Sequence, residues 1–487
     1  MISARCALDP LTRRLLPAAL LGSVLLTGCA GLAIPPPTPQ LDGLPPAWSA
    51  TAADNPARPA DRQALLAWWQ QFNDPLLSDL VAQALAANTG LRSAQAALRQ
   101  ARALQDVAAA GLGPTLGGSA DAQRSRTGLG SAGSSSNRFG AGLDASWEID
   151  LFGGQRSALA ASTASAEASA ASLGDVQVSL AAEVALAYIG LRNAQARLAI
   201  AEANLASQQE TLQITRWRQQ AGLVDMLQAE QAQAAAEQTR AGLPPLQSTL
   251  AQTRHALAVL TGQPPAALDA ALAASAPVPQ PATTLALAGP ADTLRQRPDV
   301  RAAELRLQAE WARLAQADAA LRPSLRLSGS LGLNALTLGG LGSGSALAGS
   351  LLAGLSLPLF DGGALRGQQR AQQAVLDQAQ ESWRASVLAA LQEVEDALVA
   401  LRNNRERLQR LQAAAQAATN AATLANQRYR SGLVDFQTVL DTQRSQLGAQ
   451  DSLASTAAEL AADHVRLYKS LGGGWADAPA AAATPTP

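Results

Sequence analysis

Two stretches of the chain alternate between apolar and polar residues with a period of two. From Phe139 to Leu151 every second residue is apolar, and the residues between them are polar or glycine. In 324–334 (SLRLSGSLGLN) leucines take one row, while Ser, Arg and Asn take most of the other. Because side chains alternate across a β-strand, this pattern predicts two strands, each with one apolar and one polar face.

Weaker alternation predicts two further strands, so that strand pairs lie at about 115–151 and about 324–359. Alternation alone also fits a half-buried strand of a soluble protein. Length favours a membrane, because these segments have roughly 9 to 13 residues, which a tilted strand needs to cross a bilayer, whereas soluble strands have about five or six. The stretches between paired strands, 125–137 and 335–349, are rich in Gly and Ser, as exposed turns are.

The remaining long stretches follow a helical pattern. Small or apolar residues recur at alternating spacings of four and three, which is typical of helices packed side by side. They are Leu180, Val184, Ala187, Leu191, Ala194, Leu198, Ala201 and Leu205, and later Val387, Leu391, Val394, Leu398 and Leu401. Helices of about 60 residues would be on the order of 90 Å long. Pro244 and Pro245 predict a kink or break in the last helix of the first half.

The chain is internally duplicated. Four landmarks recur in the same order about 210 residues apart, among them LFGG at 151 and LFDGG at 359, and the tetrapeptide GLVD at 222 and at 432. We therefore divide the chain into repeat 1 at 63–262, a Pro-rich linker at 263–291 and repeat 2 at 292–474. Each repeat is predicted to contain a helix, two strands and a long helical hairpin whose tip is GLVD.

The N-terminus has the layout of a secretory signal. Arginines precede the short apolar run 15–26, and Leu26-Thr27-Gly28-Cys29 resembles the bacterial lipobox. We expect a signal peptide at 1–28 and a covalent lipid, such as palmitate, on Cys29. Since Ala30 and not Asp follows the cysteine, resemblance to sorted lipoproteins favours the outer membrane. Residues 29–62 are Pro-rich and predicted to be an extended lipid-anchored segment, and 475–487 a disordered tail.

Composition argues against several classes of protein. The net charge of −1 does not favour nucleic-acid binding. His255 and His464 are the only histidines; they fall near equivalent points of the two repeats, which suggests a shared structural position. The sequence contains no metal-ligand cluster, nucleophile motif or phosphate-binding loop. We therefore expect neither an enzyme nor a cofactor or metal, apart from the lipid.

Closure of the sheet predicts an oligomer. Four strands cannot close a barrel, because known barrels begin at about eight, and open strand edges are not tolerated in hydrocarbon. If the strands are transmembrane, several copies have to pool them, and a homotrimer would supply twelve.

At this point the chain resembles the TolC-type outer-membrane factors, in particular the lipid-anchored branch that works with resistance-nodulation-division pumps. WWQQFNDPLLSDLVAQALAAN at 68–88, LRQRPDVRAAE at 294–304, LFDGG at 359 and YRSGLVDFQTVLDTQRS at 429 carry the resemblance. It implies an α+β membrane protein: a trimer whose twelve-stranded outer-membrane β-barrel continues into a periplasmic helical barrel. It further implies a passive exit duct for drugs or other toxic small molecules, with a periplasmic adaptor and an inner-membrane pump as partners.

The resemblance also implies roles for single residues. The two GLVD segments become hairpin tips, with glycine permitting the sharp reversal, aspartate capping the next helix, and exposed Leu and Val contacting the adaptor. These adaptor-docking residues are Gly222, Leu223, Val224, Asp225, Gly432, Leu433, Val434 and Asp435. The periplasmic gate falls on Gln437 and Asp441, with Tyr429 before the turn. Three Asp441 carboxylates near one axis would repel each other and attract cations.

Two other readings stay open at the level of sequence. A duct for type I protein secretion would have the same fold with other partners, although the lipobox favours small-molecule efflux. A periplasmic adaptor or coiled-coil scaffold is also helical and lipid-anchored, but duplication and paired membrane-length strands count against it. The transported substrate is not readable from the sequence.

Overall fold

The computed structural model describes residues 44–49, 65–127, 134–281 and 289–475, which form two compact units. Unit 1 contains 99–168 and 303–383, and unit 2 contains the described parts of 41–98, 169–302 and 384–487. Cys29, the predicted signal peptide, most of the segment 29–62 and nearly all of the tail lie outside the described residues.

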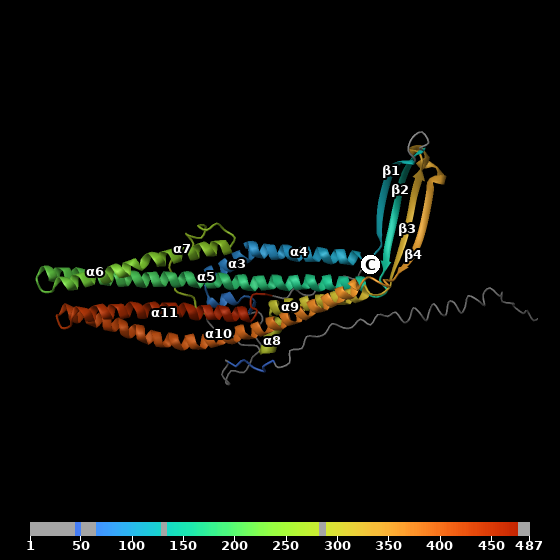
Figure 1. The fold of residues 1–487 in the computed structure, drawn as a ribbon. Coiled ribbons are helices and arrows are strands. Elements are labelled where there is room, and N and C mark those ends of the chain that lie inside the picture. The colour runs from blue at the N-terminus through green and yellow to red at the C-terminus, as the bar shows by residue number, and fades with distance from the viewer. Residues whose placement is uncertain (1–43, 50–64, 128–133, 282–288, 476–487) are drawn as a thin grey trace, which may run out of the picture. The chain divides into compact units, whose positions relative to one another are not determined.

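Unit 1 is built around a four-stranded antiparallel sheet (Figure 1). Its strands are β1 (Thr115–Thr127), β2 (Ser134–Ile149), β3 (Ser324–Ala335) and β4 (Leu347–Ser356), in the spatial order β1-β2-β3-β4. The first hairpin extends further than the sequence pattern predicts, since β1 and β2 pair as far as Thr127 and Ser134, within the expected Gly/Ser turn. Backbone pairing continues there because it does not need apolar side chains.

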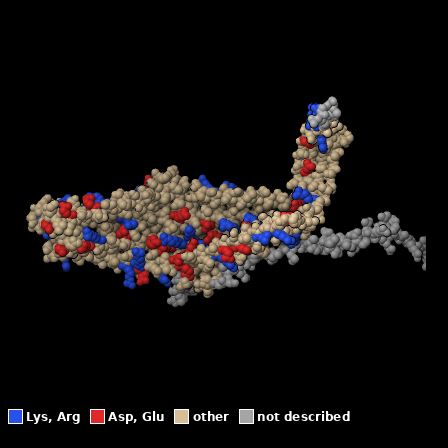
Figure 2. Space-filling model, in the orientation of Figure 1, with Lys and Arg blue, Asp and Glu red and all other residues tan. Residues whose placement is uncertain are grey.

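The register of the sheet places most apolar residues of the four strands on one face, although Leu352 of β4 lies on the other. Leu116 lies opposite Ala145, which lies opposite Gly329, which lies opposite Leu351. The opposite face bears mostly Ser, Gly and charged residues; there Asp144 lies opposite Ser330. In one copy the apolar face is largely uncovered, with Leu116 and Leu351 72% and 78% exposed. Figure 2 shows few charged side chains over the sheet.

Four helices join the strands to the rest of the repeats and have residues in both units. They are α4 (Thr89–Ala110), α5 (Gly154–Gln220), α9 (Pro298–Ala319) and α10 (Ala364–Arg430). The repeat is visible in their lengths, since α4 and α9 both have 22 residues and α5 and α10 both have 67. At 1.5 Å per residue, α5 and α10 are each about 100 Å long.

Unit 2 contains two antiparallel helical hairpins that pack side by side (Figure 1). The first joins α5 to α6 (Met226–Ala241) and α7 (Leu243–Leu260), and the second joins α10 to α11 (Phe436–Ser470). As the two prolines predict, the last helix of repeat 1 breaks; the interruption is at Gly242, and both prolines lie in the first turn of α7. The break does not change the length of this part relative to repeat 2. The 16 residues of α6, Gly242 and the 18 residues of α7 together equal the 35 residues of the unbroken α11.

The single helix expected before each strand pair is in fact divided. In repeat 1 a 3-10 helix η1 (Trp68–Phe72) and α3 (Pro75–Ala87) precede α4, and in repeat 2 α8 (Pro290–Gln296) precedes α9. Asn88 separates the first pair and caps α4, since its side chain accepts a hydrogen bond from the Leu91 amide. Pro298 forces the second break, because a residue before proline avoids the helical conformation, and Arg297 is extended.

The core of unit 2 is formed mainly by residues of η1, α3, α5, α7, α10 and α11. Trp68 and Tyr468 are fully buried and stack at 5.2 Å between ring centroids. Most of the predicted seam is buried around them, including Leu180, Val184 and Leu191 on α5. The described part of the linker packs here as well, because Leu272 is fully buried and Arg192 donates to the Ala274 carbonyl at 2.7 Å.

The two histidines do not share a structural position, contrary to the expectation. His255 lies 29 residues after the start of α6 and His464 lies 28 residues after the start of α11, so they fall on different helix faces. His255 is exposed, whereas His464 is half-buried beside Tyr468. Burial, reinforced by the positive charge of Arg405, lowers the pKa of His464 to about 4.

Candidate functional site

The two GLVD segments are the reversals at the ends of the hairpins. Gly222 and Gly432 both have φ of +71°, a conformation that glycine adopts without steric cost. The Leu223 amide donates to the Arg218 carbonyl at 2.8 Å, and the Leu433 amide donates to the Arg428 carbonyl at 2.9 Å. Together with the bonds from the glycine amides, this is the Schellman motif that ends a helix.

The aspartates of both tips cap the following helices. The Asp225 carboxylate accepts a hydrogen bond from the Gln228 amide at 3.1 Å, and the Asp435 carboxylate accepts one from the Thr438 amide at 2.9 Å. Hydrogen bonds from the Thr438 hydroxyl and amide lower the pKa of Asp435 below its usual value. Both carboxylates therefore have a structural role, whatever else the tips bind.

The apolar side chains of the tips divide into exposed and half-buried ones. Leu223 and Leu433 are 69% and 74% exposed. Val224 and Val434, which we expected to be exposed, are half-buried, and Val434 packs against the apolar cluster between the hairpins. Only the leucines of the two tetrapeptides are therefore fully available to a partner in this structure.

The first tip presents a larger apolar surface than the second. Trp217, Met226 and Leu227 are each 60–64% exposed next to Leu223. The equivalent residues of the second tip are Gln427, Phe436 and Gln437, of which only Phe436 is apolar, and it is buried. Sequence reasoning missed this difference, because it compared the tetrapeptides and not the residues that flank them.

The three predicted gate residues do not lie together. Gln437 and Asp441 lie one turn apart on the exposed side of α11, where the Gln437 amide donates to the Asp441 carboxylate at 2.9 Å. Arg444 lies 3.7 Å from the same carboxylate oxygen, and both side chains are mostly exposed. Tyr429 instead is 4% exposed, inside the contact between the hairpins.

Tyr429 is the centre of the contact between the two hairpins near their tips. Its ring lies 5.5 Å from the Phe436 ring, and the Arg218 guanidinium covers it at 4.7 Å. Arg218 also donates to the Tyr429 carbonyl at 3.1 Å, so one arginine of the first hairpin holds both the ring and the backbone of the second. Arg430 and Glu210 add an exposed ion pair between the hairpins at 2.6 Å.

Further along the hairpins the packing becomes polar. Buried Gln443 donates to the Thr211 hydroxyl at 3.1 Å, and Asn204 donates to Gln450 at 2.9 Å. Arg197 and Asp451 form a bidentate, half-exposed pair at 2.6 and 3.1 Å. Such polar layers fix the register of packed helices at some cost in stability.

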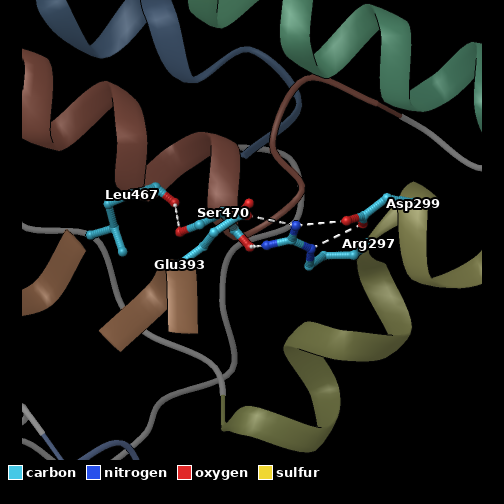
Figure 3. Close-up of polar contacts among 5 residues, drawn as sticks. All are labelled: Arg297, Asp299, Glu393, Leu467 and Ser470. Carbon is cyan, nitrogen blue, oxygen red and sulfur yellow. Dashed lines mark hydrogen bonds and ion pairs between the residues drawn. The ribbon is translucent and has the colours of Figure 1, made fainter. Parts of the chain in front are cut away.

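A second polar site in unit 2 involves the RPD sequence at 297–299 (Figure 3). Arg297 binds both oxygens of Asp299 at 3.0 and 2.7 Å, Glu393 at 2.7 Å, and the Ser470 carbonyl at the end of α11 at 2.9 Å. Burial alone would lower the pKa of Arg297, but the two carboxylates outweigh it and raise the pKa. Arg297 in turn holds the pKa of Asp299 below its usual value, against burial.

A cavity of about 230 Å³ adjoins this arginine. Asp175 and Lys469 also line it, and burial together with the negative charge of Asp299 raises the pKa of Asp175. In the described residues no group of His, Cys, Asp and Glu is arranged to hold a metal ion. The hydrogen bonds of Arg297 join the start of α9, the middle of α10 and the end of α11, and we assign them a structural role.

Comparison with known proteins identifies the class of protein. Residues 80–263 and 289–473 match the family model for outer membrane efflux proteins, one segment for each repeat. The chain belongs to the outer membrane efflux protein family. This confirms the resemblance to TolC-type factors and the fold class, and it places the protein in the outer membrane with its helical part in the periplasm.

Relatives of this efflux protein match it over nearly their whole length. The pyoverdine export outer membrane protein OpmQ of Pseudomonas putida is 36% identical over 461 residues, which cover 92% of this chain and 96% of OpmQ. The toluene efflux pump outer membrane protein TtgF, also of Pseudomonas putida, is 33% identical and covers 93% of this chain and 95% of TtgF. The solved outer-membrane channel OprN superposes with a TM-score of 0.84 at 38% identity, over 92% of this chain and 99% of OprN.

Proposed function

We propose that three copies of this efflux protein form the outer-membrane exit duct of a tripartite pump. The observation that carries the proposal is the sheet, which has one apolar face and two free edges, β1 and β4. Pairing β4 of each copy with β1 of the next removes every edge, and three copies supply twelve strands. The apolar face then contacts lipid and the polar face lines a water-filled lumen.

Small molecules are the proposed cargo, and the duct conducts them passively. The relatives named for toluene efflux and pyoverdine export support an efflux role over protein secretion. Energy comes from an inner-membrane pump of the resistance-nodulation-division type, reached through a periplasmic adaptor. A covalent lipid on Cys29 anchors the chain, and loss of labelled palmitate incorporation in Cys29→Ala would test that part.

The hairpin tips are the proposed adaptor-docking surface. Leu223 and Leu433 are exposed at the turns, and Gly222, Asp225, Gly432 and Asp435 hold those turns in shape. The first tip adds Trp217, Met226 and Leu227, so it offers the larger apolar contact. Exposed apolar clusters of this kind commonly mark protein-binding sites.

The periplasmic gate is proposed to consist of Gln437 and Asp441 from each copy, with Tyr429 holding their hairpin in place. The first hairpin has Leu227 and Gln231 at the equivalent positions, so it lacks the carboxylate. Three Asp441 carboxylates around one axis repel each other and favour cations, which suits a narrow, selective aperture.

Single-channel conductance in planar bilayers tests the channel and the gate separately. Wild-type protein is expected to form pores, and Asp441→Ala to raise their conductance. Gln231→Ala is the matched control on the first hairpin and should leave conductance unchanged. Absence of pores from a monomeric protein would refute the duct, whereas equal conductance of Asp441→Ala and wild type would remove Asp441 from the gate.

A further inference from the structure

Two arginines interrupt the apolar face of the sheet at one end. The residues of β1 that share this face are Leu116, Gly118, Ala120, Ala122, Arg124 and Arg126. Arg124 lies opposite Asn137 of β2, and Arg126 lies opposite Ser135. In the four strands as the structure describes them, these two arginines are the only charged residues on the apolar face.

The other charged residues of the strands lie on the polar face, and several have partners there. They are Asp121, Arg138, Asp144, Glu148 and Arg326. Arg138 donates two hydrogen bonds to the Asn334 side-chain oxygen at 3.3 and 3.0 Å, and Arg326 lies 3.5 Å from Glu148. Arg124 and Arg126 are both exposed, and among the described residues neither side chain has a hydrogen bond or an ion pair.

The two arginines lie at the end of the sheet that is remote from the helices. β1 begins shortly after α4 and β2 ends shortly before α5, so the end at Thr115 and Ile149 adjoins the helices. Since the helical part of the protein is in the periplasm, the opposite end faces the outer surface of the membrane. Figure 2 shows basic side chains at this end of the sheet.

The length of the strands places Arg124 at the border of the hydrocarbon. Trp147 marks the periplasmic border, because its ring lies on the apolar face and its N–H donates to the Leu112 carbonyl at 2.9 Å. From Trp147 to Asn137, the partner of Arg124, β2 runs for ten residues. This is about 33 Å along the strand and about 25 Å in height at a tilt of about 40°. The apolar band of outer-membrane barrels is about 25 Å tall, so Arg124 lies at its outer border and Arg126 just beyond it.

We propose that Arg124 and Arg126 bind the phosphate groups of lipid headgroups in the outer leaflet of the outer membrane. This inference rests on the proposed barrel, which turns their face towards lipid. The outer leaflet of an outer membrane consists largely of phosphorylated glycolipid, so negative charge is concentrated at the level of these arginines. A guanidinium binds a phosphate through paired, charge-assisted hydrogen bonds.

The surroundings of the two arginines suit such a headgroup. Their Cα atoms are about 7 Å apart, because they are two residues apart on one strand, so both guanidinium groups can reach one headgroup. The residues opposite, Asn137 and Ser135, are small and polar and leave the guanidinium groups uncovered. The apolar face has no acidic residue in the described strands that would cancel their charge. Half-buried Phe139 lies one row closer to the membrane centre, where acyl chains would cover it.

Binding of purified lipid A, a bisphosphorylated glycolipid, tests the site. Full-length protein in detergent is titrated with lipid A, and native mass spectrometry measures the lipid-bound fraction. Arg124→Gln/Arg126→Gln should weaken binding by at least about tenfold, because each arginine loses a charge-assisted contact. Arg138→Gln is the matched control, since it removes the same charge at the same end but on the polar face. It should change the affinity by less than about twofold.

Two ligand comparisons on the wild-type protein need no variant and therefore do not depend on its folding. Dephosphorylated lipid A should bind at least about tenfold more weakly than lipid A, because the arginines then have no anion to bind. Inorganic phosphate in excess should not displace lipid A. Displacement would identify free phosphate as the ligand and overturn the assignment to a lipid.

The proposal fails if wild type binds both forms of lipid A equally, or if the double variant binds lipid A as well as wild type does. Equal weakening by Arg138→Gln would also overturn it, because the effect would then follow net charge and not the lipid-facing position. If wild type forms conducting pores but shows no preference for phosphorylated lipid, this site is wrong and the duct stands. If wild type is monomeric and forms no pores, the proposed function fails first.

Discussion

Tyr429 offers a direct test of how the two hairpins are held together near their tips. Replacing it by alanine removes a ring that is 4% exposed, its contact with Phe436 at 5.5 Å and the face on which Arg218 lies at 4.7 Å. Truncation of a buried aromatic residue costs about 3–5 kcal/mol, which includes its ring contacts. Because about 1.4 kcal/mol corresponds to a factor of ten, even the lower value predicts about a hundredfold increase in local opening.

Amide hydrogen exchange measured by mass spectrometry reads this opening directly. Peptides from 422–443 of Tyr429→Ala should exchange about a hundredfold faster, while peptides from the distant end of α11 near Tyr468 should not change. Tyr429→Phe is the matched control, because it keeps the ring and loses only a 3.5 Å hydroxyl contact with Gln228. It should change exchange less than tenfold. Equal effects of the two variants would refute the reasoning that ring packing joins the hairpins.

Three further results are expected. Arg297→Ala leaves the carboxylates of Asp299 and Glu393 without their partner and should lower the free energy of unfolding by about 2–4 kcal/mol in thermal unfolding; a loss no larger than that of Arg297→Lys would contradict it. Asp175→Asn should raise the Tm at pH 7, because the raised pKa of the Asp175 carboxyl means that its charged form destabilises the folded state. The gain in Tm should vanish as the pH falls through the raised pKa towards the ordinary carboxyl pKa of 3.8, and a gain that does not depend on pH would exclude this cause. Gly432→Ala should destabilise the second tip by about 1 kcal/mol, because its φ is +71°, whereas Gly448→Ala in the middle of α11 should be neutral or stabilising; the same sign for both would contradict the argument.

Much of the architecture could be predicted because its signals are local and periodic. The period-two patterns at 139–151 and 324–334 predicted strands where the structure has β2 and β3. The heptad spacing of Leu180, Val184 and Leu191 predicted the side of α5 that is buried. The GLVD turns could be recognised because glycine and aspartate perform backbone tasks that few other residues can. The divided helices before each strand pair were missed, because Asn88 and Pro298 act at single positions within otherwise helical patterns.

The candidate site was only partly predictable. Gln437 and Asp441 lie one turn apart, so sequence spacing alone places them on one helix face. The family resemblance grouped Tyr429 with them, but it lies on α10 before the turn and is buried in the contact with the first hairpin. Which apolar residues of the tips are exposed also depends on the neighbouring hairpin, which buries Phe436 and half-buries Val434.

The sequence by itself determined the duplication, the strand and helix repertoire and the positions of both tips, because periodicity and turn chemistry depend on neighbours along the chain. Only the tertiary structure decided that the four strands place most of their apolar residues on a common face and that Arg218 holds Tyr429. These features join residues about 200 positions apart. Pairing between such distant segments is fixed by which surfaces meet in space, and no local pattern records it.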